Sequence, residues 1–243
     1  MTSISIVIPA YNEEKRLPAT LRSVIGYLAS RDERAYEVLV VNDGSRDGTA
    51  RVAAEFARSN PCVHLLENPG NRGKGYSVRH GMLKAQGDWV LFTDSDLSAP
   101  IEELDKLRAA VRERNAEVAI GSRAVDRSLI DIHQSFFRET AGRIFNLLMR
   151  ILTGLPFHDT QCGFKLFSSR AARETFRRQR IARWGFDVEV LFIARKLGFK
   201  TVEVPVRWSH SEGTKINMFS DSANMFLDLV RVRWNWIRGL YRG

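Results

Sequence analysis

Residues 1–121 alternate short apolar runs with amphipathic segments, and this alternation most constrains the fold. Five runs have the length and composition of strands: 3–8, 36–41, 62–67, 88–93 and 117–121. Four segments between them show apolar residues at helical spacing: 14–29, 47–58, 75–85 and 101–114. The alternation predicts an α/β fold, in which a mostly parallel central sheet has helices on both faces.

Polar residues gather in the loops that would follow four of these strands. The loops are 9–13, 42–47, 68–75 and 94–100, and all are rich in Asp, Asn, Gly or Lys. In a parallel sheet of this kind, ligands bind beyond the carboxyl ends of the strands, which share one edge. We therefore expect the four loops to form one site.

Asp94 and Asp96 come directly after the apolar run 90–93. One residue separates them, so an extended chain points both carboxylates to the same side. Such oxygen ligands suit Mg²⁺ or Mn²⁺ shared with a diphosphate. An Asp-x-Asp pair also occurs often in solvated turns, so the pair alone leaves both interpretations open.

The loop 68–75 is rich in glycine and places Lys74 next to a predicted helix start. It is not a P-loop, because Asn68 and Gly75 stand where that pattern needs Gly and Ser or Thr. It is not a dinucleotide-binding fingerprint either, since Val78 replaces the last Gly. Lys74 is a candidate for neutralising a diphosphate, and a simple glycine-rich turn is the alternative.

The net charge of +9 is concentrated in the second half of the chain. Residues 1–120 contain 16 Lys and Arg against 17 Asp and Glu, whereas residues 121–243 contain 21 against 11. This excess predicts an anionic partner, such as phosphate groups, an acidic membrane surface or nucleic acid. The basic residues alternate with apolar ones in amphipathic segments and no recognised nucleic-acid motif occurs, so we expect no nucleic-acid partner.

The second half predicts helices at 136–152 and 186–196, strands at 162–167 and 200–206, and a long terminal helix at 218–241. The terminal helix mixes Phe and Trp with Arg at spacings of three and four. This composition is typical of a helix in the plane of a membrane interface. A core-packing helix with a basic solvent face is the alternative, and the two are compatible.

We expect a peripheral protein that is neither exported nor membrane-spanning. No run reaches the roughly 18 apolar residues that a spanning helix needs. The first residues enter a predicted strand rather than a signal peptide. Two distant cysteines without metal-site spacing favour reduced thiols and a cytosolic setting.

Taken in order, the motifs at 8–13, 42–45, 71–75 and 94–96 resemble the nucleotide-sugar domain of family 2 inverting glycosyltransferases, which have the Rossmann-like GT-A fold. The blocks at 159–167, 183–189 and 212–215, together with Trp208, resemble the dolichyl-phosphate β-glucosyltransferases, relatives of the dolichyl-phosphate mannosyltransferases. The resemblance covers almost the whole chain. It implies one catalytic domain, with a nucleotide-sugar-binding half at 1–121 and an acceptor-binding, membrane-interface half at 122–243.

The resemblance implies inverting transfer of a hexose, glucose from UDP-glucose, to a polyprenyl phosphate. It also implies a role for each matching residue. The donor-binding residues would be Pro9, Tyr11, Glu13, Asp43, Lys74, Asp94 and Asp96. Of these, Asp96 with Asp94 would hold Mg²⁺ or Mn²⁺. Asp159 would lie near the reacting carbon, and Arg123, Arg138 and Lys215 are candidates for binding the acceptor phosphate.

Three points stay open at this stage. No residue reads glucose directly, so GDP-mannose and UDP-N-acetylglucosamine are alternative donors. A catalytically idle membrane scaffold of the same fold is a further alternative. Eukaryotic members of the resembled family begin with a membrane-spanning helix that this sequence does not show, which leaves the lipid acceptor open. The resemblance also implies a location: we expect a peripheral protein on the cytoplasmic face of a membrane.

Overall fold

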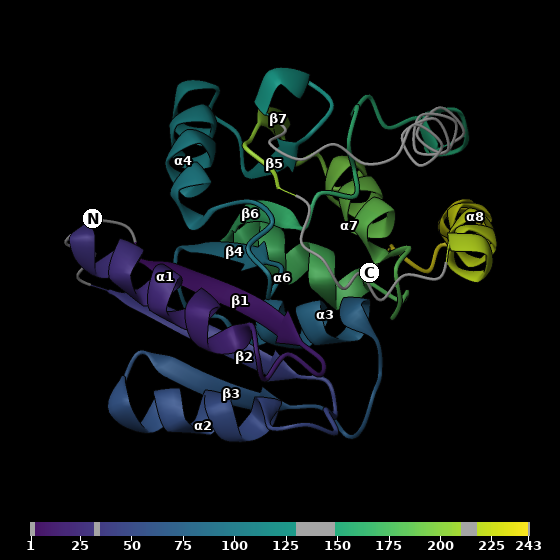
Figure 1. The fold of residues 1–243 in the computed structure, drawn as a ribbon. Coiled ribbons are helices and arrows are strands. Elements are labelled where there is room, and N and C mark those ends of the chain that lie inside the picture. The colour runs from purple at the N-terminus through teal and green to yellow at the C-terminus, as the bar shows by residue number, and fades with distance from the viewer. Residues whose placement is uncertain (1–2, 32–34, 130–148, 210–217, 243) are drawn as a thin grey trace.

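A computed structural model describes residues 3–31, 35–129, 149–209 and 218–242. One sheet runs through the middle of the molecule (Figure 1). Its strands are β1 (Ile4–Ala10), β2 (Tyr36–Asn42), β3 (Val63–Glu67), β4 (Trp89–Thr93), β5 (Val118–Ser122), β6 (Phe164–Ser168) and β7 (Thr201–Pro205). The helices are α1 (Leu17–Ser30), α2 (Thr49–Ser59), α3 (Lys74–Lys84), α4 (Leu104–Glu113), α6 (Ser169–Arg178), α7 (Phe186–Lys196) and α8 (Met218–Ile237). Residues 149–153 are also helical.

The strands follow the order β3-β2-β1-β4-β6-β5-β7 across the sheet. β1 pairs in parallel with both β2 and β4, and β2 pairs in parallel with β3. β6 is antiparallel to its neighbours β4 and β5, while β5 and β7 are parallel. The predicted mostly parallel sheet is confirmed. Its strand order reverses between β1 and β4, which is where sheets of this kind bind ligands.

Alternate residues of the strands enter two cores, one on each face of the sheet. Ile4, Ile6 and Ile8 of β1 pack in the core that includes α1, α2 and α4. Val7 of the same strand packs in the core that includes α3, α6, α7 and α8. Every residue of β1 is buried, as expected for a central strand that is covered on both faces.

The predicted elements are present with shifted ends, and the larger shifts have local causes. α1 begins at Leu17 rather than at residue 14, with a proline in its first turn, because residues 13–16 form a separate turn. α8 ends at Ile237 rather than at residue 241, because Gly239 adopts φ +73°, a left-handed conformation common after helix ends. α6 was not predicted, and the predicted helix 136–152 lies mostly outside the described residues.

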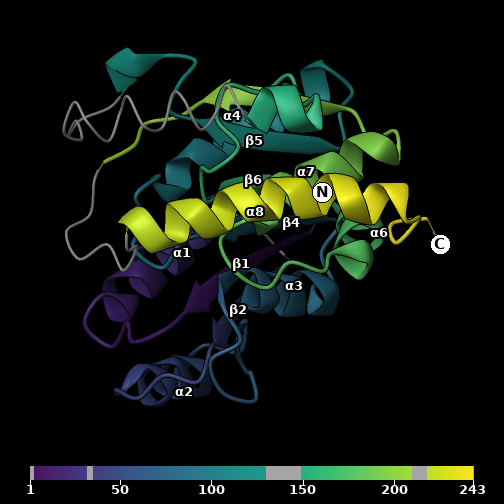
Figure 2. The same cartoon turned by 90° about the vertical axis from the view of Figure 1, so that its right-hand side faces the viewer.

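α8 carries apolar side chains on two sides. Leu229 and Val232 are buried against the body of the protein, as expected of a core-packing helix. Five further apolar residues point outward with 42–68% of their surface exposed, and we call them the outer face of α8: Phe226, Leu227, Val230, Trp234 and Ile237. Figure 2 shows this helix crossing one side of the molecule in front of α7. None of the described helices is both long and apolar enough to cross a bilayer.

Candidate active site

The loops after β1 and β2 are joined by hydrogen bonds. Asn12 accepts the N–H of Arg46 through Oδ1 at 2.8 Å and donates its own N–H to Ser45 Oγ at 3.0 Å. Glu13 donates its N–H to Thr49 Oγ1 at 2.7 Å. The two predicted loops therefore form one hydrogen-bonded unit at the carboxyl edge of the sheet.

Asp43, directly after β2, fixes the glycine-rich loop. Its Oδ1 accepts the side-chain N–H of Asn68 at 2.8 Å and the backbone N–H of Arg72 at 2.9 Å. Its Oδ2 accepts the backbone N–H of Gly73 at 2.8 Å. A carboxylate has about four lone-pair positions, so about one is left over by the described residues for a ligand.

Lys74 begins α3 and joins this loop to the end of β4. Its ammonium lies 2.5 Å from Asp94 Oδ1 and 5.5 Å from the centre of the Trp184 ring. Burial lowers the pKa of Lys74, but the charges of Asp94 and Asp187 outweigh that effect and raise the pKa above its ordinary value. Lys74 is therefore a permanent cation at a helix N-terminus, an arrangement that suits a phosphate group.

Asp94 and Asp96 occupy the predicted position beyond β4. Asp94 lies against Gly163, where a Cβ atom would be 2.1 Å from Asp94 Oδ2, so only glycine leaves room for this carboxylate. Asp96 Oδ1 accepts the N–H of Ser98 at 3.0 Å. The hydrogen bond with Glu13 raises the pKa of Arg16, and the negative charge of Asp96 adds to that effect.

The two carboxylates fit a divalent cation that takes its other ligands from a substrate. Within residues 3–31, 35–129, 149–209 and 218–242, no group of three His, Cys, Asp or Glu side chains could hold a metal. Mg²⁺ commonly uses one or two carboxylates together with phosphate oxygens and water. Asp94 and Asp96 are therefore the candidates for holding Mg²⁺ or Mn²⁺ beside a diphosphate.

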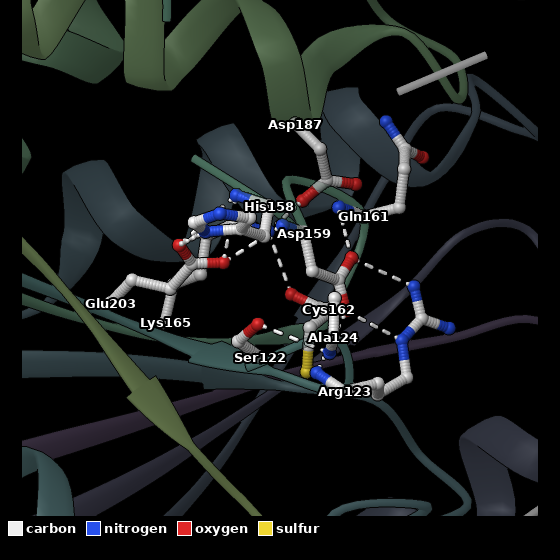
Figure 3. Close-up of polar contacts among 10 residues, drawn as sticks. All are labelled: Ser122, Arg123, Ala124, His158, Asp159, Gln161, Cys162, Lys165, Asp187 and Glu203. Atoms are coloured by element: carbon white, nitrogen blue, oxygen red, sulfur yellow. Dashed lines mark hydrogen bonds and ion pairs between the residues drawn. The ribbon is translucent and has the colours of Figure 1, made fainter. Parts of the chain in front are cut away.

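Arg123, just after β5, forms a two-pronged ion pair with Asp159 (Figure 3). Arg123 Nε and Nη2 donate to the carboxylate at 2.7 and 2.9 Å, and the Arg123 backbone N–H donates at 3.0 Å. A fourth hydrogen bond comes from the N–H of Gln161 at 3.0 Å. The hydrogen-bonding capacity of Asp159 is thus filled, whereas about three of the five N–H groups of the Arg123 side chain have no hydrogen-bond partner among the described residues.

Asp159 is 6% exposed, and its charge depends on Arg123. Burial raises the pKa of Asp159, but the charge and hydrogen bonds of Arg123 overcome this effect and lower the pKa from 3.8 to about 2. Because the folded-state pKa is the lower one, the ion pair stabilises the fold above the unfolded-state pKa. That stabilisation is lost as the pH falls toward about 2.

The remaining predicted residues are placed as follows. Pro9 is buried in β1, and Tyr11 follows the strand, half-buried. Glu13 is 7% exposed and accepts two hydrogen bonds from Arg16, at 2.6 and 2.7 Å. The structure thus brings the predicted donor residues together at one sheet edge. Arg138 and Lys215 lie outside the described residues.

A family model, glycosyl transferase family 2, matches residues 5–176. The chain belongs to this family. A dolichyl-phosphate beta-glucosyltransferase of Drosophila melanogaster is 38% identical, over 98% of this chain and 77% of the relative. The enzyme of that name from Homo sapiens is 35% identical over the same shares. The predicted family is confirmed.

Solved structures show the same fold at lower identity. Glucosyl-3-phosphoglycerate synthase from Mycobacterium tuberculosis, in complex with uridine-diphosphate, has a TM-score of 0.67 at 19% identity, over 95% of this chain and 80% of that one. Mannosyl-3-phosphoglycerate synthase from Rubrobacter xylanophilus has a TM-score of 0.69 at 20% identity, over 100% and 76%. The expected GT-A fold is confirmed.

This family 2 glycosyltransferase also has charged residues beside the candidate site that were not predicted from the sequence. Lys165 of β6 and Asp187 of α7 form an ion pair with 0% and 2% exposure, and Lys165 also donates to Cys162 O at 2.7 Å. Glu203 of β7 accepts the backbone N–H groups of His158 and Asp159 at 2.8–3.0 Å. Glu203 directly, and Asp187 through Lys165, thus hold the segment 158–163, which contains Asp159 and lies against Asp94 at Gly163. One feature of the sequence could have indicated the buried ion pair, namely a lysine inside the apolar run 164–167.

Proposed function

We propose that this glycosyltransferase transfers glucose from UDP-glucose to a polyprenyl phosphate, with inversion at C1. The observation that carries the proposal is the cluster of Lys74, Asp94 and Asp96 at the strand ends. It occurs in a chain that is 32–38% identical to dolichyl-phosphate β-glucosyltransferases over nearly its full length. A neighbour of the same fold is a complex with uridine-diphosphate, which supports a uridine donor.

On the donor side, the chain provides charge before the reaction begins. We assign residues 1–121 to the donor, with Pro9, Tyr11, Glu13 and Asp43 around the nucleoside and Lys74 on the diphosphate. Negative charge builds on the diphosphate as its bond to C1 breaks, and an already oriented ammonium group stabilises that charge without rearrangement. Mg²⁺ or Mn²⁺, held by Asp96 and Asp94, would act as a Lewis acid on the same oxygens.

On the acceptor side, we assign residues 122–243 to the lipid phosphate and the membrane. A phosphate monoester has a second pKa of about 6, so the acceptor is largely a dianion at neutral pH and needs little help from a base. A group with a pKa of about 2 is a poor proton acceptor at that pH. We therefore assign Asp159 to positioning Arg123, whose remaining N–H groups bind the acceptor phosphate. Arg138 and Lys215 stay candidates on sequence grounds.

The outer face of α8 supports attachment to a membrane surface, which we assign to the cytoplasmic face. Phe226, Val230, Trp234 and Ile237 follow at spacings of four, four and three, which places them on one side of the helix. Arg233 of α8 and Arg238, directly after the helix, are both exposed. Apolar side chains flanked by arginine suit the boundary between acyl chains and anionic headgroups.

A donor panel tests the proposed reaction. The purified protein is given polyprenyl phosphate in vesicles, a divalent metal and radiolabelled UDP-glucose, GDP-mannose or UDP-N-acetylglucosamine. We expect label from UDP-glucose to appear in the organic extract. Label from another donor would reassign the sugar. Label that appears only as a water-soluble product would indicate hydrolysis or a soluble acceptor.

Replacing both Trp234 and Ile237 with Ser is expected to reduce binding to anionic liposomes by at least about tenfold, because each buried apolar side chain of this size contributes about 1.5–3 kcal/mol. Co-sedimentation measures the effect. Leu197, an apolar residue directly after α7 with 36% exposure, provides the control substitution Leu197→Ser. Unchanged sedimentation of the double variant would contradict membrane binding by the outer face of α8 and would leave the helix with core packing alone.

A further inference from the structure

Glu189 of α7 is a fully buried acid for which the proposed reaction has no use. Its two oxygens accept the backbone N–H groups of Arg180 at 3.1 Å and Ile181 at 2.8 Å. Oε1 also accepts the phenol O–H of Tyr241 at 2.6 Å. Glu189 therefore joins the loop before α7 to the segment that follows α8.

The loop held by Glu189 lies directly against the glycine-rich loop. The N–H of Tyr76 donates to Ala182 O at 3.0 Å, and Gln179 Nε2 donates to Gly75 O at 2.9 Å. A Cβ atom at Gly73 would lie 2.6 Å from Ala182 O, so the two backbones touch. The same loop continues to Trp184, whose ring lies beside the ammonium of Lys74.

Tyr241 is held in place from α8 as well. Asn235 Nδ2 donates to the Tyr241 oxygen at 3.2 Å, and Arg180 Nη2 donates to the carbonyl of Leu240 at 3.2 Å. This arrangement exists because α8 ends at Ile237 and the chain turns back toward the body of the protein. One continuous set of contacts thus runs from the end of α8, through Glu189, to Lys74.

We propose that Glu189 is a positioning residue for the donor diphosphate, and that it acts by fixing the 179–184 loop, and with it Lys74, against Tyr241. The proposal rests on the proposed function, in which Lys74 binds the diphosphate. Weakening the contact between Tyr241 and Glu189 frees the loop that supports Lys74. The affinity for a nucleoside diphosphate then falls, although neither residue is placed in contact with the nucleotide.

Tyr241→Phe tests this proposal, because it removes one O–H group and keeps the ring. Tyr27→Phe is a matched control: Tyr27 is 6% exposed, Tyr241 is 2% exposed, and Tyr27 donates to Asp105 Oδ1 at 2.8 Å between α1 and α4. Calorimetric titration with UDP, and separately with GDP, measures the dissociation constant of each protein in Mn²⁺. Loss of one hydrogen bond corresponds to an increase of about three- to tenfold in the dissociation constant. We therefore expect that increase for Tyr241→Phe and an increase of less than about twofold for Tyr27→Phe.

The outcomes separate the inference from the proposed function. If the wild-type protein binds UDP or GDP and Tyr241→Phe binds it equally well, the positioning role of Glu189 is overturned alone. Equal losses in both tyrosine variants would also overturn it, because they would indicate general destabilisation. If the wild-type protein binds neither nucleotide, the proposed function and this inference fail together. Glu189→Gln, which presents an amide to the two backbone N–H groups, should weaken binding at least as much as Tyr241→Phe.

Discussion

Replacing Asp96 with Asn is expected to lower the rate of sugar transfer by about 10²- to 10³-fold at saturating donor, the range seen when one group that stabilises transition-state charge is lost. The amide keeps the size of the side chain, and its oxygen can still accept the N–H of Ser98. It removes the negative charge through which Asp96 would bind a cation. Initial rates across a titration of Mg²⁺ and of Mn²⁺ measure the effect, with circular dichroism to confirm the fold.

Asp88→Asn is the matched control for this substitution. Asp88 immediately precedes β4, whereas Asp94 and Asp96 follow it, so the two changes affect opposite ends of one strand. The Asp88 carboxylate accepts the N–H and O–H groups of Ser3 at 2.8 and 3.0 Å, away from the predicted site. We expect wild-type activity from Asp88→Asn. Full activity of Asp96→Asn at any metal concentration would remove Asp96 from its proposed role.

The candidate site at the carboxyl edge of the sheet was predictable because the residues that form it directly follow the strands in the sequence. Apolar runs such as 90–93 indicate strands directly, and a parallel sheet brings the residues after its strands to one edge. Asp43, Lys74, Asp94 and Asp96 could therefore be grouped without knowledge of any contact. The three hydrogen bonds that Asp43 accepts from the glycine-rich loop were not predictable from the sequence, because they depend on how the loop folds back.

The supporting residues were not predictable, because their partners lie far apart in the chain. Lys165 and Asp187 are separated by 22 residues and Asp159 and Glu203 by 44. The first pair forms only because β6 inserts antiparallel between β4 and β5. α6 was not predicted for a different reason: its segment is dominated by arginine and other polar residues, and Phe176 is its one large apolar side chain.

The end of α8 shows how one residue changed the interpretation of a segment. The apolar spacing from 218 onward continues to Leu240 and predicts one helix to residue 241. Gly239 instead adopts a left-handed conformation, and Tyr241 turns inward to Glu189. The apolar side chains of this segment are divided between the core and the surface, with Leu229 inside and Ile237 outside.

Arg123→Ala is expected to raise the polyprenyl phosphate concentration needed for half-maximal rate by more than about tenfold, because a charged hydrogen-bonding partner of the phosphate contributes about 1.5–3 kcal/mol. The same substitution leaves the buried Asp159 carboxylate without its partner. Loss of one member of a buried ion pair lowers the free energy of unfolding by about 3–5 kcal/mol. Acceptor and donor titrations measure the first effect, and urea unfolding measures the second.

A double-mutant cycle separates the two effects of Arg123. Asp159→Asn should lower stability while it retains the positive charge at Arg123, so the acceptor affinity should fall less than in Arg123→Ala. The double variant Arg123→Ala/Asp159→Asn should be more stable than Arg123→Ala, because no unpaired carboxylate remains buried. Its acceptor affinity should stay as low as that of Arg123→Ala. If Arg123→Ala weakened UDP binding as much as it weakened acceptor use, the assignment of Arg123 to the acceptor phosphate, and with it the division between the two halves of the chain, would be wrong.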